Sequence, residues 1–198
     1  MPTAIATATI VPQCFRFLEV TPPSSLDDDS DKAQDAAEQY PTALRQCLEA
    51  ADWSFASVFV MLPPAIIPLP FTSDPDLPYT YTLPGDVVRL QEVGDLGVRW
   101  RRDAAALRAD DAGPLRVRYT AMVDDETSLP ANFRVVVALH LALLLAPRWL
   151  VTQSKTQALE ARAADLMKLA MRQDARMASE ARYDGLPDQG DWAAEATR

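Results

Sequence analysis

The sequence is poor in the residues that bind metals or form covalent links. It has two cysteines, Cys14 and Cys47, and a single histidine, His140, among 198 residues. A zinc site draws on about four nitrogen, sulfur or oxygen ligands, so this supply argues against a metal centre. Each cysteine falls within an apolar pattern and is interpreted as a small buried hydrophobe, and nothing in the chain requires an oxidising compartment.

Glycine is also scarce, with 6 residues against 16 prolines, which favours stiff connections over flexible ones. The strongest apolar run, Val135 to Ala146, is shorter than the roughly 20 residues that cross a bilayer and is interpreted as a core helix. The segment from Met1 to Val11 has no lysine or arginine, so it does not resemble a secretory signal. We therefore expect no membrane partner.

Negative charge is concentrated in the first half of the chain. The formal net charge is −9, and residues 1–100 hold 14 acidic and 5 basic side chains against 14 of each in residues 101–198. An acidic half repels phosphate, which argues against nucleic-acid binding there.

One basic stretch lies near the middle of the chain. It consists of Arg99, Arg101, Arg102, Arg108, Arg116 and Arg118. On neighbouring strands these arginines would form either a nucleic-acid stripe or a polar outer face that pairs with acids of this subunit or the next. We favour the polar face, because no aromatic residues suited to base stacking are interleaved.

Hydrophobic periodicity predicts helices at both ends of the chain. The first is Val11–Glu19, capped by Thr9; the acidic run from Asp27 to Asp31 then opens a second helix, which Pro41 interrupts before another turn begins. A calcium loop is the alternative for the acidic run, but lysine occupies the position where such a loop needs glycine.

The second helical part follows Ser128, which is expected to cap a helix with Pro130 near its first position. His140 falls within the wide apolar face of that helix and is interpreted as a buried, hydrogen-bonded core residue. Pro147 is expected to bend or end the helix, and a last long helix is predicted from Ser154 to about Ala178.

Between the helical parts, short alternating segments predict a small antiparallel sheet. The predicted strands are 58–62, 79–83, 87–93, 98–102, 107–109 and 115–120, and the proline-rich stretch 63–78 is a loop. The fold class is therefore α+β: a helical bundle with an inserted β-subdomain and an extended C-terminal tail. The divisions are 1–55 and 124–179 for the two parts of the bundle, 56–123 for the β-subdomain and 180–198 for the tail.

No motif identifies an active site. The glycine patterns of nucleotide-binding loops and the GxSxG and HExxH motifs are absent. A Ser-His-Asp triad could use only His140, and the acid pairs Asp110-Asp111 and Asp124-Asp125 sit in predicted turns. We therefore expect no catalytic residues, no bound metal and no cofactor.

An ordered series of short motifs runs through residues 15–180. They are WSFA (53–56), YTYTLPGD (79–86), VR (88–89), LRVRY (115–119) and LPANF (129–133). This succession resembles the head-to-tail adaptor (connector) family of tailed phages, of the tail tubular protein A type, which is also found in prophages and gene transfer particles. The proline-rich loop 63–78 departs from the family's pattern.

The resemblance implies a ring, usually of twelve copies, in the neck of a virion whose parts are made in the bacterial cytoplasm. The ring would join the portal to the next tail component, a stopper or tail tube, and DNA would pass through its lumen without specific binding. In such adaptors the C-terminal segment commonly inserts into the portal. The candidate docking residues here are Tyr183, Leu186, Trp192 and Arg198, and the candidate anchors of the fold or ring interface are Trp53, Phe55, Tyr79, Tyr81, Arg89, Tyr119 and Phe133.

Three other functions stay open on the sequence. The chain could be another ring protein of the same particle, such as a stopper or tail terminator, which a portal-binding C-terminus would distinguish. It could be a DNA-binding module that uses the arginines, which would show salt-dependent binding to duplex DNA. The least favoured is an enzyme that depends on His140.

Overall fold

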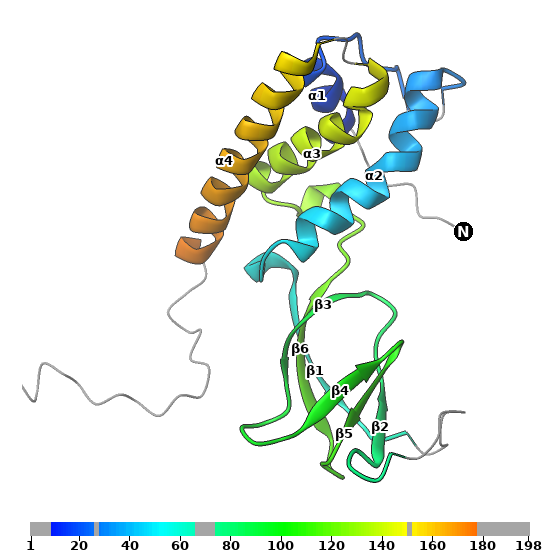
Figure 1. Ribbon diagram of the computed structural model, residues 1–198, viewed down its shortest axis with the longest axis vertical. Helices are drawn as coiled ribbons and strands as arrows, with labels where there is room; N and C mark the ends of the chain where they lie inside the picture. Colours follow the sequence, from blue (N-terminus) through cyan, green and yellow to red (C-terminus); the bar gives the residue numbers. More distant parts are fainter. Residues whose placement is uncertain (1–8, 26–27, 66–73, 150–151, 178–198) are drawn as a thin grey trace, which may run out of the picture.

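A computed structural model of the chain describes residues 9–25, 28–65, 74–149 and 152–177. Helices form a bundle at one end of the molecule, and short strands form a β-subdomain at the other (Figure 1). The helices are α1 (Ile10–Phe17), α2 (Asp31–Glu49), α3 (Ala131–Trp149) and α4 (Gln153–Met177). Two single 3₁₀ turns, η1 (Ser54–Ala56) and η2 (Glu126–Ser128), connect the β-subdomain to the bundle. The fold class is α+β, with the strands inserted between α2 and α3.

Helix α3 is the centre of the bundle, because it is apolar around most of its circumference. It contacts α1, α2 and α4, and its buried side chains include Phe133, Val137 and Leu141. By length and composition α3 is long and apolar enough to cross a membrane. The helices packed around it account for this apolar surface, so the prediction of a core helix over Val135–Ala146 is confirmed.

The prediction that Pro41 interrupts the second helix is wrong, because α2 runs continuously through it. A proline inside a helix removes one backbone hydrogen bond and costs about 3 kcal/mol. Tyr40, Ala43 and Leu44 lie around it and are buried. Packing of this face against α3 therefore offsets the local cost. Pro147 also lies inside its helix, α3, although only two residues before the helix ends.

The prediction that Ser128 caps the helix after the β-subdomain is also wrong. Ser128 belongs to η2, and Asp125 caps that turn by accepting the N–H of Thr127 at 2.9 Å. Helix α3 begins after Pro130, whose carbonyl accepts the N–H of Arg134 at 3.0 Å. The 3₁₀ turn therefore separates the strands from the helix, which the sequence pattern did not indicate.

The β-subdomain contains two three-stranded antiparallel sheets rather than the single sheet that was predicted. Its strands are β1 (Ser57–Leu62), β2 (Tyr79–Thr82), β3 (Val87–Val93), β4 (Trp100–Asp103), β5 (Ala106–Ala109) and β6 (Leu115–Ala121). The first sheet has the order β1-β6-β3 and the second has the order β2-β5-β4. The register pairs Ser57 with Thr120, so the first and last strands of the insertion lie side by side.

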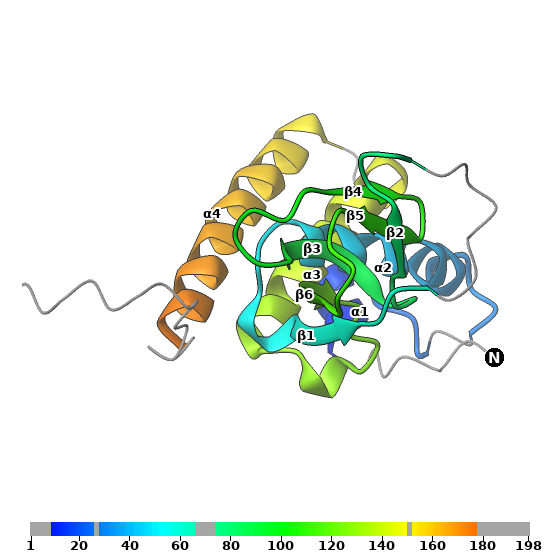
Figure 2. The same cartoon turned by 90° about the horizontal axis from the view of Figure 1, so that it is seen from below.

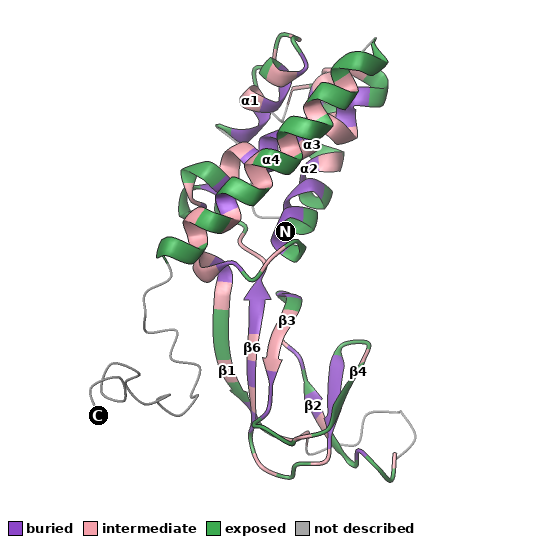
Figure 3. Ribbon diagram, turned by 60° about the vertical axis from the view of Figure 1, so that its left-hand side comes forward, coloured by how far each residue is buried: buried purple, intermediate pink, exposed green. Residues whose placement is uncertain are grey.

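The two sheets share one apolar core. Tyr81, Leu107 and Val117 belong to it and are fully buried, and Figure 3 shows β6 as the most buried strand of the first sheet. The Tyr81 hydroxyl donates to the carbonyls of Asp111 and Gly113 at 2.5 and 2.8 Å. A buried phenol with this geometry fixes the β5–β6 turn against β2.

The β-subdomain meets the bundle at the beginning of β3. The Arg89 guanidinium donates to the carbonyl of Glu49, at the C-terminal end of α2, at 3.3 Å, and it lies 3.6 Å from the Asp52 carboxylate. Positive charge is favourable at a helix C-terminus. Val88, one residue earlier, belongs to the apolar core of the bundle. The two parts therefore share packing as well as two covalent connections.

Helix α4 lies on the outside of the bundle, at one side of the strands, whereas α1, α2 and α3 lie above them (Figure 2). Ala170 is its fully buried residue, and the rest of its surface is exposed or partly buried. Near its C-terminal end, Asp174 accepts the backbone N–H and the hydroxyl of Ser54 at 2.8 and 2.6 Å. This contact holds the end of α4 against η1.

Candidate functional site

Three of the predicted anchors form one aromatic cluster where η1 meets the start of α3. The ring centroid of Phe133 lies 4.9 Å from the ring centroids of both Trp53 and Phe55. The ring centroids of Trp53 and Phe55 are 5.7 Å apart. Trp53 and Phe133 are buried, and the indole N–H donates to the carbonyl of Cys47 at 2.8 Å. The WSFA motif therefore places side chains that stabilise the junction between bundle and strands.

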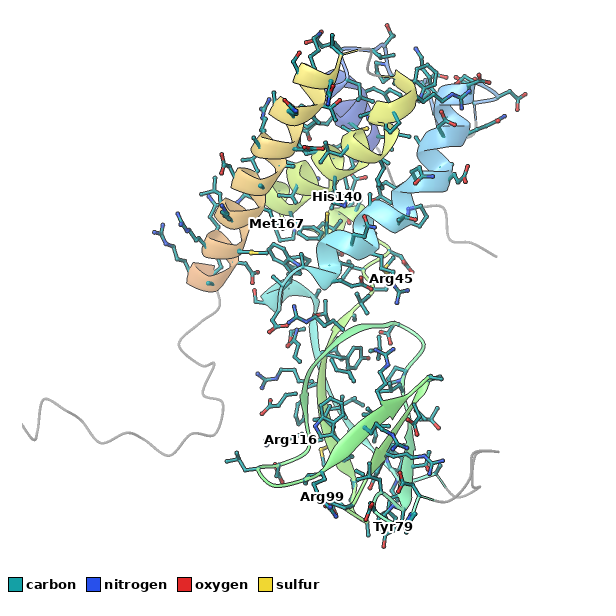
Figure 4. All side chains as sticks on the ribbon, in the orientation of Figure 1. Arg45, Tyr79, Arg99, Arg116, His140 and Met167 are labelled. Carbon is teal, nitrogen blue, oxygen red and sulfur yellow. The ribbon has the colours of Figure 1, made fainter. Side chains whose placement is uncertain are left out.

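The other predicted anchors divide between core and surface. Tyr81 and Tyr119 are buried, and the Tyr119 hydroxyl donates to the Asp86 carboxylate at 3.2 Å. Arg89 lies at the junction described above. Tyr79 is exposed at the end of the second sheet farthest from the helices (Figure 4). The four predicted docking residues, Tyr183, Leu186, Trp192 and Arg198, lie outside the described residues.

The arginines of the strands pair with acids of their own chain. Arg99 lies 3.0 Å from Asp110, and its hydrogen bond holds the pKa of that carboxyl below its usual value. Buried Arg108 lies 3.0 Å from Asp103, whose pKa is lowered first by its hydrogen bond from Arg101.

The same pairing extends to the first sheet. Arg116 lies 3.1 Å from Asp95, and Arg118 lies 3.8 Å from Glu92. Arg102 instead donates to a backbone carbonyl, that of Ala104. The favoured interpretation, a polar outer face that pairs with acids, is confirmed for Arg99, Arg116 and Arg118. Arg108 is buried and therefore does not belong to an outer face.

His140 is only partly buried, so the expectation of a fully buried histidine is wrong. It lies between α3 and α2 (Figure 4), where its Nε2 is 2.7 Å from the amide oxygen of Gln46. A hydrogen bond to this oxygen is made by the tautomer that carries its proton on Nε2. Burial lowers the pKa of His140. Among the described residues, the hydrogen bond shown for this histidine is to Gln46 rather than to a serine or a carboxylate.

Both cysteines are buried in the bundle and free. Burial raises the pKa of each thiol to about 12. A thiol that stays protonated is a poor nucleophile and a poor metal ligand, so Cys14 and Cys47 act as packing residues. Among the described residues, no group of three or more histidine, cysteine or acidic side chains is arranged to hold a metal ion.

Glu126 is a structural residue that the sequence patterns missed. Its carboxylate accepts the N–H groups of Thr9 and Ile10 at 3.1 and 3.2 Å, and also the Thr9 hydroxyl. These donors belong to the N-terminus of α1, where negative charge is favourable. Thr9 occupies the N-cap position of α1, but its side chain accepts no hydrogen bond from the helix. The prediction that Thr9 caps this helix with its own side chain is therefore wrong. The partner lies more than a hundred residues away, and no local pattern could indicate it.

A shallow groove of about 270 Å³ lies between α1 and the first half of α4. Its apolar lining includes Phe17 and Leu159, and Arg162 lies over the Phe17 ring at 5.0 Å. Lys155 bridges it by an ion pair with Glu19 at 2.5 Å. The charged groups of its lining are three cations, Arg16, Lys155 and Arg162, and one carboxylate, Glu19.

Uncovered apolar side chains are concentrated in the β-subdomain. Of the eight large apolar residues that are exposed in the described structure, six lie there and two lie on α4. They are Val58, Phe59, Met61, Tyr79, Leu96 and Trp100. Single apolar side chains are normal on a protein surface, whereas a contiguous patch of them is typical of a protein-binding site. Two sequence signals could have found it: β1 is apolar on both faces, and Leu96 stands in a turn between two glycines.

No protein-family model matches the sequence, and a search of curated proteins finds no match. The interpretation of function therefore depends on the residues, their arrangement and the order of the motifs.

Proposed function

We propose that this chain is a structural subunit of a tailed-phage or phage-like particle, a head-to-tail adaptor that forms a ring between the portal and the tail. The observation that carries the proposal is the position of the adaptor-like motifs in the fold. WSFA forms the connection into β1, YTYTLPGD forms β2 and the turn into β3, and LPANF opens α3. WSFA and LPANF thus lie where the bundle and the β-subdomain are joined, whereas YTYTLPGD begins at the far end of the second sheet (Figure 4) and leads towards β3.

The charge distribution supports the same role. DNA must pass through the ring without being held, and contacts with phosphate depend on unpaired lysine and arginine. The net charge is −9, and the arginines of the strands are largely paired with carboxylates. A DNA-binding module that uses these arginines is correspondingly disfavoured.

In this proposal the partners are further copies of the chain, usually twelve in a ring, the portal above and a stopper or tail tube below. The location is the neck of the virion, after synthesis in the bacterial cytoplasm. The subunit needs no cofactor, and its role is assembly rather than catalysis. Many identical contacts around a ring make individually weak contacts collectively strong.

The C-terminal segment is the proposed portal-binding element, through Tyr183, Leu186 and Trp192, with Arg198 at its end. Aromatic anchors of this kind commonly dominate the energy of an interface. The test is co-sedimentation of the full chain with portal-bearing, DNA-filled heads, comparing wild type with Tyr183→Ala/Leu186→Ala/Trp192→Ala. Leu169→Ala, on the exposed side of α4, is the matched control.

We expect wild type and the control to sediment with heads, and the triple variant to lose at least tenfold in bound protein. Equal binding by the triple variant would remove the docking role of the tail. Absence of binding by every chain would favour the alternative of a more distal ring protein, a stopper or tail terminator.

A further inference from the structure

The groove between α1 and the first half of α4, called the α1–α4 groove below, holds two cations that lack an acidic partner. Of the charged groups in its lining, Lys155 pairs with Glu19. Arg16 and Arg162 remain, and neither lies within ion-pairing distance of a carboxylate among the described residues. The arginines of the strands, in contrast, are largely paired with acids. The groove therefore carries excess positive charge on a chain whose net charge is −9.

The α1–α4 groove is apolar between these two cations. Phe17 and Leu159 line it and are partly buried, and fully buried Leu139 lines it as well. The Arg162 guanidinium lies over the Phe17 ring, 5.0 Å from its centroid. A guanidinium held on an aromatic face is weakly hydrated and is well suited to pairing with a carboxylate. A ligand that fits this groove combines a flat apolar group with negative charge on either side of it.

The C-terminal segment of this chain has that composition. Residues 178–198 contain five acidic and two basic side chains, so the segment is negatively charged. Trp192 directly follows Asp191, and only two alanines separate it from Glu195. An indole bury a large apolar surface while its N–H stays available for a hydrogen bond. An indole flanked by carboxylates therefore complements an apolar groove flanked by guanidinium groups.

The length of the chain after α4 determines which aromatic residue can reach the groove. Helix α4 runs from beside α1 to its end at Met177 (Figure 1). At 1.5 Å per residue, Leu159 in the groove lies about 27 Å before that end. Tyr183 follows Met177 by six residues, which span about 20 Å when fully extended. Trp192 follows it by 15 residues, which span up to about 50 Å, so Trp192 reaches the groove whereas Tyr183 does not.

We propose that the α1–α4 groove binds the C-terminal segment of its own chain. The Trp192 indole packs against Phe17, and the carboxylates on either side of the indole pair with Arg16 and Arg162. Attachment through α4 keeps the segment at a high local concentration, on the order of mM for a short flexible linker. A contact that would be weak between separate molecules therefore forms within one chain.

The contact itself goes beyond the function proposed above, whereas its consequence rests on that function. Trp192 is also a proposed portal anchor, and one indole cannot occupy the groove and the portal at the same time. The groove and the portal therefore compete for the segment. In the free subunit the groove holds the segment, and binding to the portal releases it.

The test is cross-linking within a full-length chain that carries two new cysteines. Ala158→Cys lies in the lining of the groove, and Ala194→Cys lies two residues after Trp192. In the matched control, Ala164→Cys replaces Ala158→Cys, because Ala164 is also exposed on α4, does not line the groove and lies nearer to Met177. The two native thiols stay unreactive, because burial raises their pKa to about 12. A short bis-maleimide is added to dilute protein, and the products are assigned by peptide mass spectrometry.

We expect the 158–194 species to form within single chains at least tenfold faster than the 164–194 species. A segment without a binding site would react at least as fast at position 164, which is nearer to it along the helix. Adding Trp192→Ala to the 158–194 chain should reduce its rate to that of the control. Adding Arg16→Gln/Arg162→Gln should do the same.

Two results would overturn the proposal. Equal rates for the 158–194 and 164–194 species, or a 158–194 rate that Trp192→Ala leaves unchanged, would show that the groove does not bind this segment. Products that are mainly dimers, formed at a rate that rises with protein concentration, would show that the occupant comes from another copy of the chain.

The experiment separates this proposal from the adaptor role, since it uses free subunits without heads. Specific cross-linking that added portal does not slow would keep the contact and remove the portal-binding role of the segment. Tail-dependent binding to heads without specific cross-linking would keep the adaptor role and remove this contact.

Discussion

Replacing Glu126 with alanine should lower the free energy of unfolding by about 2–4 kcal/mol. Glu126 is only 2% exposed, and its carboxylate accepts the N–H groups of Thr9 and Ile10 at the start of α1. Alanine leaves these donors without a partner. The Ile10 N–H is buried and cannot turn to water, and a stranded buried donor costs about 1–3 kcal/mol. The Thr9 N–H is partly accessible to water, so leaving it without its partner should cost an amount near the lower end of this range.

Glu126→Gln should cost at least 1 kcal/mol less than Glu126→Ala. Glutamine keeps an oxygen that accepts the α1 N–H groups and loses only the favourable charge at the helix terminus. Among the described residues, neither the other carboxylate oxygen of Glu126 nor the hydroxyl of Tyr40 has a hydrogen-bond partner, and both atoms are buried. Burial, followed by the charges of Glu126 and Asp124, raises the pKa of Tyr40.

The assay is urea unfolding followed by tryptophan fluorescence, with the slope compared among variants to establish that the unfolded states are equivalent. Asp124→Ala is the control, because Asp124 is exposed two residues away and should change stability by less than about 0.5 kcal/mol. The reasoning is refuted if Glu126→Ala behaves like this control, or if the glutamine variant is as unstable as the alanine variant.

Two further predictions concern the bundle. Trp53→Ala should destabilise the fold by about 3–5 kcal/mol in the same assay, because it removes a buried ring from the aromatic cluster; a loss below 1 kcal/mol would contradict the packing described. Burial lowers the pKa of His140 below 6.5, so the unfolded chain binds the proton more readily and stability should fall as the pH drops from about 7 to 5.5. His140→Gln should reduce the dependence of the free energy of unfolding on pH over this range. If the variant and wild type lose stability equally as the pH falls, other titratable groups cause the loss.

Local patterns in the sequence predicted the elements well. Alternation located all six strands within two residues of their ends, and Val87–Val93 was placed without error. A period near 3.6 located α3 and α4. These signals are local because a strand or helix buries one face at a fixed spacing. The α+β class followed from their order along the chain.

Three of the failures share a physical cause, which is dependence on distant residues. Pro41 stays helical because neighbouring side chains pack on α3. The division of the strands into two sheets depends on β1 finding β6 across the whole insertion. Glu126 stabilises a helix that begins more than a hundred residues earlier. A local pattern in the sequence indicates which secondary structure a segment prefers. It does not indicate which distant residues pack against that segment and override the preference.

The candidate site was predicted less well than the fold. Trp53, Phe133, Tyr81 and Tyr119 were proposed as anchors of the fold or the ring, and all four are core residues. Phe59, Met61 and Leu96 were not singled out, because an apolar residue in a strand or turn pattern is usually assigned to the core. Only the accessible surface distinguishes an apolar side chain that packs inside from one that is left for a partner.

Electron microscopy of the chain mixed with purified portal tests the adaptor role most directly. The account predicts class averages in which this protein forms a ring coaxial with the portal, with the segment 180–198 inserted into it. Images in which portal and protein remain separate, or in which this protein binds only to a different ring of the tail, would contradict the account.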